Sequence, residues 1–234
     1  MTATTGGTQL FQNHRRLTVF AAGIAVAAAL LGSWALFEGA SQSDASRKQP
    51  FGDAIATLQQ DPGAAVARVN GVDIPAAKLR AYGILSEAGF GVDAAPKIPA
   101  SQYLDGLINS EVLYQEAVKD GFAPTAEAIH SLAVEQKTGL LDFIQQDTPE
   151  AANLRSVFDE VKGTPYGLDV YDTSPEMLDG FRRQLSVNAL ETHVISQLPA
   201  ADQKDPAKRN AAIDSLTVDL RSHAKIEILA PVSY

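Results

Sequence analysis

The sequence predicts a mainly α-helical domain with a small β element, preceded by one transmembrane helix. Three observations lead to this prediction. Residues 17–37 carry no charge, and apolar residues recur at three- and four-residue steps through most of the chain after residue 75. Two short alternating stretches, residues 66–74 and 224–229, lie at opposite ends of the helical region. We expect the β element to join these two ends.

The uncharged run, residues 17–37, is the candidate membrane anchor. A helix of this length spans about 31 Å at about 1.5 Å per residue, which matches the hydrocarbon core of a bilayer. His14, Arg15 and Arg16 precede it, and no Lys or Arg follows until Arg47. The positive-inside rule therefore predicts a cytoplasmic tail at 1–16, a single pass through the cell (inner) membrane, and an extracytoplasmic C-terminal domain.

A cleaved signal peptide is the alternative reading of the same run. Secretory apolar regions usually span about 7 to 15 residues, so the longer run favours a retained anchor, although a cleavage site can be drawn at residues 43–45. Residues 30–33 resemble a lipobox, but Ser33 stands where the lipid-bearing cysteine is needed. The sequence thus excludes lipidation at this position.

Composition bounds the chemistry of the remaining chain. The 234 residues include no cysteine, which excludes disulfides, thiolate metal sites and cysteine nucleophiles. The formal net charge is -9, so the chain repels phosphate backbones and nucleic acid is not an expected partner. We divide the outer part into a linker at 38–63, one domain at 64–230 and a tail at 231–234, a length that suits a single core.

Several local signals set the first elements of the domain. The sequence offers a short helix candidate at 53–60 within the linker. Asn70-Gly71 lies between alternating apolar residues and predicts a type I′ hairpin over 66–74. Pro75 suits the first turn of a helix to about residue 88. The strongest helix covers 101–120, where Gly121 provides a left-handed cap and Phe122 is placed to pack back on the last turn.

Capping residues set the later helices. Thr125 predicts the start of a helix to about residue 145, and a shorter helix follows at 150–161. Ser174-Pro175-Glu176 begins a helix that extends to about residue 198, where Pro199 stops it. Asp205-Pro206 begins the last helix. An isolated two-stranded hairpin is marginal, so we expect the strand at 224–229 to pair with residues 66–74.

Two segments together resemble a known family. Residues 66–74 read V-A-R-V-N-G-V-D-I, and residues 104–122 read L-D-G-L-I-N-S-E-V-L-Y-Q-E-A-V-K-D-G-F. They are similar to the N-terminal domain of SurA-type chaperones, whose pattern is a V-A-x-V-N-G-x-x-I hairpin and a helix L-x-x-L-I-x-x-x-L-L-x-x-E-A-x-x-x-G. The closing residues 216–229 resemble the helix and strand that complete that SurA-N-like fold. With the anchor, the chain also resembles the membrane-tethered PpiD group, whereas lipid-anchored PrsA relatives need the missing cysteine.

The departures from the family pattern concern catalysis. Many relatives carry a parvulin prolyl-isomerase domain before the terminal helix, and here only residues 199–204 separate the two predicted helices. The Gly-Gly pair typical of that domain occurs only at Gly6-Gly7. Pro75 stands where the family usually has a Ser or Thr cap. The resemblance therefore implies a chain that is not an enzyme.

The sequence contains no motif for the other common kinds of functional site. The four histidines are scattered and lack the i, i+4 spacing of a zinc helix. An acidic cluster lacks the alternation and central glycine of a calcium loop, and it is expected to serve as solvated loop and cap residues: Asp169, Asp172, Glu176 and Asp179. A G-x-S-x-G elbow and phosphate-binding glycine loops are also missing. We predict no catalytic, cofactor or metal residues and no cofactor.

Aromatic residues are the remaining candidates for binding. Helical spacing assigns most of them to the core, but Tyr166 and Tyr171 lie in a segment rich in Gly, Pro and Asp, where rings can reach an exposed groove. Such a groove would hold an unfolded client by apolar burial, at about 25 cal/mol per Å². The candidate client-binding residues are Phe143, Phe158, Tyr166, Tyr171 and Phe181.

The resemblance and the anchor lead to one functional hypothesis and its alternatives. The first is a membrane-tethered extracytoplasmic chaperone or assembly factor that binds unfolded or exported polypeptides without ATP. The second is a non-catalytic structural subunit of a membrane protein complex that uses the fold as a docking module. A prolyl isomerase is the third.

Overall fold

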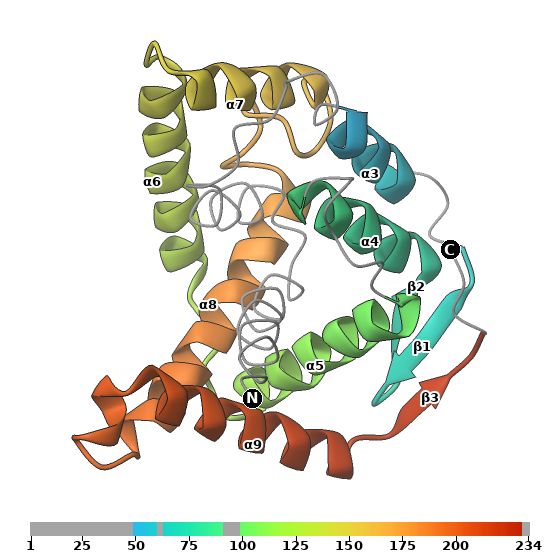
Figure 1. The fold of residues 1–234 in the computed structure, drawn as a ribbon, viewed down its shortest axis with the longest axis vertical. Coiled ribbons are helices and arrows are strands. Elements are labelled where there is room, and N and C mark those ends of the chain that lie inside the picture. The colour runs from blue at the N-terminus through green and yellow to red at the C-terminus, as the bar shows by residue number, and fades with distance from the viewer. Residues whose placement is uncertain (1–48, 60–62, 91–98, 231–234) are drawn as a thin grey trace, which may run out of the picture.

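The computed structural model describes residues 49–59, 63–90 and 99–230. These residues form a mainly helical body with one small sheet, as predicted (Figure 1). The predicted tail at 1–16, the anchor at 17–37, most of the linker at 38–63 and the tail at 231–234 lie outside the described residues. Among the helices that are described, none combines the length and apolarity needed to cross a bilayer.

The sheet joins the two ends of the domain. Strands β1 (Ala65–Val69) and β2 (Val72–Pro75) form an antiparallel hairpin, and β3 (Ile226–Ile228) pairs antiparallel with the other side of β1. The order β2-β1-β3 confirms the predicted pairing. At the hairpin turn Asn70 has φ 50° and Gly71 has φ 89°, so both central residues are left-handed, as a type I′ turn requires.

Three helices flank the hairpin along the chain. Helix α3 (Gln49–Gln59) precedes it, and α4 (Ala76–Phe90) and α5 (Ala100–Lys119) follow. Pro75 ends β2, so α4 begins one residue later than predicted. After α5, Gly121 has φ 84°, the amide of Phe122 donates to Ala117 O at 2.8 Å, and that of Gly121 donates to Val118 O at 3.1 Å. These two bonds form a Schellman motif and confirm the predicted cap.

The later helices begin at capping side chains. Thr125 caps α6 (Ala126–Ile144), Thr148 caps α7 (Pro149–Glu160) and Ser174 caps α8 (Pro175–Ser196). Helix α8 ends two residues before the predicted limit. A short 3-10 turn, η2 (Asp202–Lys204), then leads to α9 (Pro206–His223), whose cap is Asp205. Each predicted helix is therefore present. The ends differ by one or two residues, except that α3 begins four residues before the predicted start at residue 53.

Apolar burial is divided between two main clusters. The sheet-side core packs β1 and β2 against α4 and α5, and the helix-side core packs α3, α6, α7 and α8 together. A smaller joining cluster links α5 to the second half of α8 through Leu113, Ala117, Val187 and Leu190. In Figure 1, α8 runs from the region of α6 and α7 toward α9, so one helix contributes to both the helix-side core and the joining cluster.

The segment between α7 and α8 is a succession of turns. Backbone amides at 164, 167, 170 and 173 each donate to the carbonyl three residues earlier, with N···O distances of 3.0 to 3.2 Å. A Cβ on Gly167 would lie 2.4 Å from Asp169 Oδ1 and 3.1 Å from Val161 O, so a side chain here would require the Asp169 carboxylate to move and the turn to adjust slightly. The turns satisfy the backbone of an irregular segment and allow its side chains to pack inward.

Candidate functional site

The five rings predicted to bind clients mostly lie in the helix-side core. Phe158 is 6% exposed, Tyr166 8%, and Tyr171 and Phe181 are fully buried, while Phe143 on α6 is half-buried. The prediction that Tyr166 and Tyr171 reach an exposed groove is therefore wrong, because both rings are buried. The physical reason is the turn segment, which satisfies its own backbone and places both rings against α6 and α8. A client would contact these rings only after this core opened.

Specific contacts fix the two most buried rings. The centroids of Tyr171 and Phe181 are 5.6 Å apart at 57°, and the Tyr171 hydroxyl donates to Gln136 Oε1 at 3.1 Å. Burial raises the pKa of Tyr171 well above its ordinary value and also raises the pKa of Tyr166. Both hydroxyls are therefore held in their neutral form.

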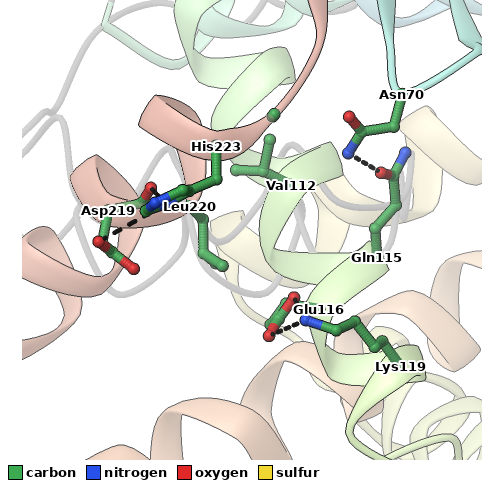
Figure 2. A pocket seen from close by; sticks show the side chains of 9 residues that line it. Asn70, Val112, Gln115, Glu116, Lys119, Asp219, Leu220 and His223 are labelled. Atoms are coloured by element: carbon green, nitrogen blue, oxygen red, sulfur yellow. Dashed lines mark hydrogen bonds and ion pairs between the residues drawn. The ribbon is translucent and has the colours of Figure 1, made fainter.

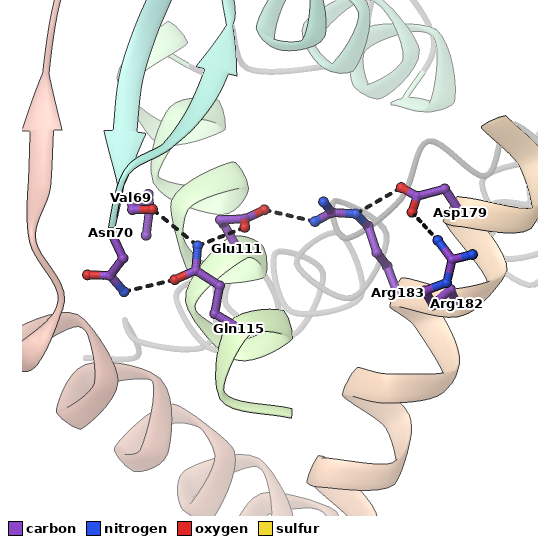
Figure 3. Close-up of polar contacts among 7 residues, drawn as sticks. All are labelled: Val69, Asn70, Glu111, Gln115, Asp179, Arg182 and Arg183. Carbon is purple, nitrogen blue, oxygen red and sulfur yellow. Dashed lines mark hydrogen bonds and ion pairs between the residues drawn. The ribbon is translucent and has the colours of Figure 1, made fainter. Parts of the chain in front are cut away.

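A line of polar contacts connects the hairpin to α8 through α5 (Figure 3). Gln115 accepts a hydrogen bond from Asn70 Nδ2 at 2.8 Å and donates to Val69 O at 3.1 Å. Its amide also donates to Glu111 Oε1 at 2.8 Å, and the other Glu111 oxygen accepts from Arg183 at 2.8 Å. Glu111 is only 6% exposed, so this carboxylate is buried together with its partners.

Arg183 is the opposite end of that line. Its Nε donates to Asp179 at 3.1 Å, and its guanidinium carbon lies 4.2 Å from the centre of the Tyr114 ring. Burial opposes the positive charge, but attraction and hydrogen bonds from Glu111 and Asp179 outweigh burial and raise the pKa of Arg183. The guanidinium is therefore held between two carboxylates and an aromatic face.

Lys78 on α4 completes this polar centre, which we define as Lys78, Glu111, Asp179 and Arg183. Burial, and then repulsion by Arg183, lower the pKa of Lys78 against the attraction of Glu111 and Asp179. These side chains come from α4, α5 and α8, and the hydrogen bond from Arg183 to Glu111 directly links α8 to α5. Over residues 49–59, 63–90 and 99–230, no group of three potential metal ligands is found.

A groove opens on the surface between α5 and α9, beside the hairpin turn (Figure 2). Its volume is about 360 Å³, and its apolar lining is Val112, Leu220 and Ala224. The polar lining pairs with itself: Asn70 with Gln115, Lys119 with Glu116 at 2.8 Å, and His223 with Asp219 at 3.7 Å. The groove thus presents a mixed lining of apolar and self-paired polar side chains with both signs of charge, which suits a polypeptide segment better than a phosphate.

The outer face of the sheet carries a row of charges. Arg68 on β1 pairs with Asp73 on β2 and lies 3.7 Å from Glu227 on β3, and Lys225 lies 2.7 Å from Glu227. Ile228 and Leu229, at the end of β3, are 57% and 44% exposed. The sheet therefore combines a charged outer face with an apolar end at β3.

The other residues considered from sequence are dispersed or locally paired. His130, His193 and His223 lie on α6, α8 and α9. In the acidic cluster, Asp172 accepts from Lys137 at 2.7 Å, and this hydrogen bond is the main reason that the pKa of Asp172 is lowered. Asp179 and Glu176 pair with neighbouring side chains on α8 and at its cap.

Sequence reasoning missed the polar centre, although one signal was present. Glu111 falls four residues after Leu107 and three after Ile108, on the buried stripe of α5. A carboxylate on an apolar stripe requires a cationic or donor partner, because an unpaired buried charge is costly. That partner, Arg183, lies 72 residues away along the chain, so no pattern near Glu111 identifies it.

Comparison with known proteins adds nothing to this description of the site. The chain matches no protein-family model, no curated protein and no solved structure.

Proposed function

We propose that this protein is a membrane-tethered extracytoplasmic chaperone or assembly factor, with a SurA-N-like domain that binds unfolded or exported polypeptides without ATP. The observation that carries the proposal is the closure of the N-terminal hairpin by the C-terminal strand in the order β2-β1-β3. This is the arrangement that the resemblance of residues 66–74, 104–122 and 216–229 implies. The uncharged run at 17–37 provides the proposed tether.

A non-catalytic role is part of the proposal. Only residues 197–205 connect α8 to α9, and they contain a single short turn, so an inserted isomerase domain has no place in this connection. Prolyl-isomerase activity above background, measured with the full chain on a proline-containing peptide, would contradict this part of the proposal.

The groove between α5 and α9 is the proposed client surface. Most of the five aromatic residues are buried, whereas the groove is open at the surface and combines the half-buried Leu220 and Ala224 with a self-paired polar rim. Apolar burial contributes about 25 cal/mol per Å², so a groove of this size gives weak binding with little selectivity. Weak and unselective binding suits a chaperone that must release its clients.

The test uses the full chain in lipid nanodiscs. It should slow the aggregation of an unfolded client, and a photo-crosslinking side chain at His223 should attach to that client. Val218 provides the matched control, because it lies on the same helix and is 69% exposed but is not among the residues that line the groove. Unchanged aggregation, together with equal crosslinking at the two positions, would contradict the proposal.

A second candidate function is a fixed, non-catalytic subunit of a membrane protein complex. The observation that favours it is the closed character of the body, in which the large rings are buried and the polar centre is internally paired. Extraction in a mild detergent separates the two functions. A subunit copurifies with the same partners in constant ratio, whereas a chaperone brings down many clients in small amounts.

A further inference from the structure

The outer edge of β3 carries hydrogen-bonding groups that the sheet does not use. Lys225 O accepts from the amide of Asn70, and the amide of Leu229 donates to Val66 O, so the odd-numbered residues of β3 face β1. Because pairing alternates along an antiparallel strand, the amides and carbonyls of Ile226 and Ile228 face outward. Within the part of the chain that the structure describes, no strand lies on that side.

The two edges of the sheet differ in protection. The β2 edge ends at Pro75, which has no amide hydrogen to offer another strand. The β3 edge has neither a proline nor a bulge, and two aliphatic side chains beside it, Ile228 and Leu229, remain about half exposed. An unprotected edge with exposed apolar neighbours is suited to pairing with another strand.

We propose that β3 pairs with β3 of a second copy of this chain, antiparallel across a two-fold axis, to form one six-stranded sheet. Only registers that oppose outward-facing residues with one another make the hydrogen bonds. A register centred on Ile226 places Lys225 opposite Glu227 of the second copy, twice. A register centred on Glu227 instead opposes two carboxylates at close range. Charge therefore favours the register centred on Ile226, where two opposite-charge pairs form, over the register centred on Glu227.

The faces of the sheet agree with this pairing. Arg68, Asp73 and Glu227 share the outer face, whereas Ile226 and Ile228 share the face that covers the core. The two-fold axis keeps these faces on the same sides in both copies, and Ile228 then lies beside Ala224 of the second copy. Pairing would cover the side chain that is 57% exposed in the single chain.

The expected association is weak, because the strand is only three residues long. Stable interfaces bury on the order of 1,000 Å² or more, and this contact is smaller. We therefore expect a dimer that forms with increasing protein concentration. Self-association of this kind does not depend on whether a client is bound.

The first test uses engineered cysteines, because the chain has none of its own. Full-length Lys225→Cys and Glu227→Cys, one of them carrying a mass tag, are mixed in nanodiscs or detergent and oxidised. The disulfide-linked heterodimer should exceed either homodimer, because residue 225 opposes residue 227 of the second copy. Ser215→Cys on α9 measures random collision. Heterodimer at the level of this control would overturn the proposal, and predominance of the Glu227→Cys homodimer would overturn the register.

The second test reverses the charges and measures the dimer dissociation constant. Glu227→Lys should weaken association about tenfold, because two attractive pairs become repulsive. The double variant Lys225→Glu with Glu227→Lys should restore it, because opposite charges face each other again. Circular dichroism checks that each variant folds. Equal dissociation constants for the three proteins, or a double variant as weak as the single one, would overturn the proposal.

Discussion

The sheet-side core and the helix-side core are built from different residues. The sheet-side core is largely aliphatic and comes from elements close to one another along the chain, apart from β3 and the end of α9. The helix-side core instead gathers Phe158, Tyr166, Tyr171, Met177 and Phe181 around a turn segment, with help from the distant helix α3. The first core follows from local periodicity, whereas the second depends on contacts that no local pattern specifies.

Although the two cores differ in composition, helix α8 connects them. Helix α8 contributes Phe181 to the helix-side core and Val187 and Leu190 to the joining cluster. Arg183 lies between these positions and reaches Glu111 on α5. The two regions should therefore unfold together, although their cores have different compositions.

The largest effect is expected from Phe181→Ala. Removal of this fully buried ring should lower the free energy of unfolding by about 3 to 5 kcal/mol. Because α8 also packs against α5 through the joining cluster, amide hydrogen exchange should accelerate in β1 as well as in α6. Val218→Ala, at a position 69% exposed, should change stability by less than about 0.5 kcal/mol. Faster exchange confined to α6 and α7 would show that the regions unfold independently.

The ion pair between α5 and α8 should have the next largest effect. Glu111→Gln removes a charge-assisted hydrogen bond to Arg183 and should cost about 1.5 to 3 kcal/mol in urea denaturation. Replacing both partners, with Glu111→Gln and Arg183→Met, should cost less than the sum of the single changes. Strict additivity would indicate that the pair does not couple the two regions.

Alkaline pH tests one tyrosine in the helix-side core and one that packs against the sheet-side core. Burial raises the pKa of Tyr171 in the helix-side core and that of Tyr82 beside the sheet-side core. Both stay neutral in the folded protein while the unfolded chain ionises near pH 10, so stability is complete below about pH 10 and falls above it. Tyr171→Phe and Tyr82→Phe should each make that fall less steep, as measured by urea midpoints across this range. An unchanged slope in one variant would show that the tyrosine it replaces does not contribute to the loss of stability at alkaline pH.

The smallest effect is expected on the acid side. The pKa of Asp172 is lowered, mainly by its hydrogen bond from Lys137. Its contribution is present above the unfolded pKa near 3.9 and is lost as pH falls through the lower folded value. Asp172→Asn should remove less than about 1 kcal/mol at neutral pH and flatten the acid limb. Lys137→Met removes the same ion pair and also the hydrogen bond from Lys137 to Asp169 O at 3.2 Å, so it should destabilise at least as much. An unchanged acid limb in both variants would show that the ion pair does not contribute.

Local chemistry accounts for what the sequence predicted correctly. Asn70-Gly71, Gly121, Thr125 and Ser174 each specify a backbone conformation within a few residues, so the hairpin and the helix ends followed from neighbouring positions. The pairing of β3 with β1 followed from a general need, because a two-stranded hairpin requires a further partner.

The candidate site was harder to predict. Tyr166 and Tyr171 lie among residues typical of exposed loops, and their burial depends on four successive turns and on helices far away in the sequence. Glu111 was visible as a polar residue on an apolar stripe, but its pairing with Arg183 requires the packing of α5 against α8. Side-chain positions that depend on tertiary packing cannot be read from one window of sequence.

The central position of β1 affects the order in which this protein matures. The strand is synthesised near the start of the domain, yet one of its two neighbours comes from residues 226–228. During synthesis β1 must wait for most of the polypeptide to emerge, with that side of its backbone exposed to other chains. Contacts between distant residues form slowly, so this protein, which we propose to be a chaperone, would itself pass through an incompletely folded stage during synthesis.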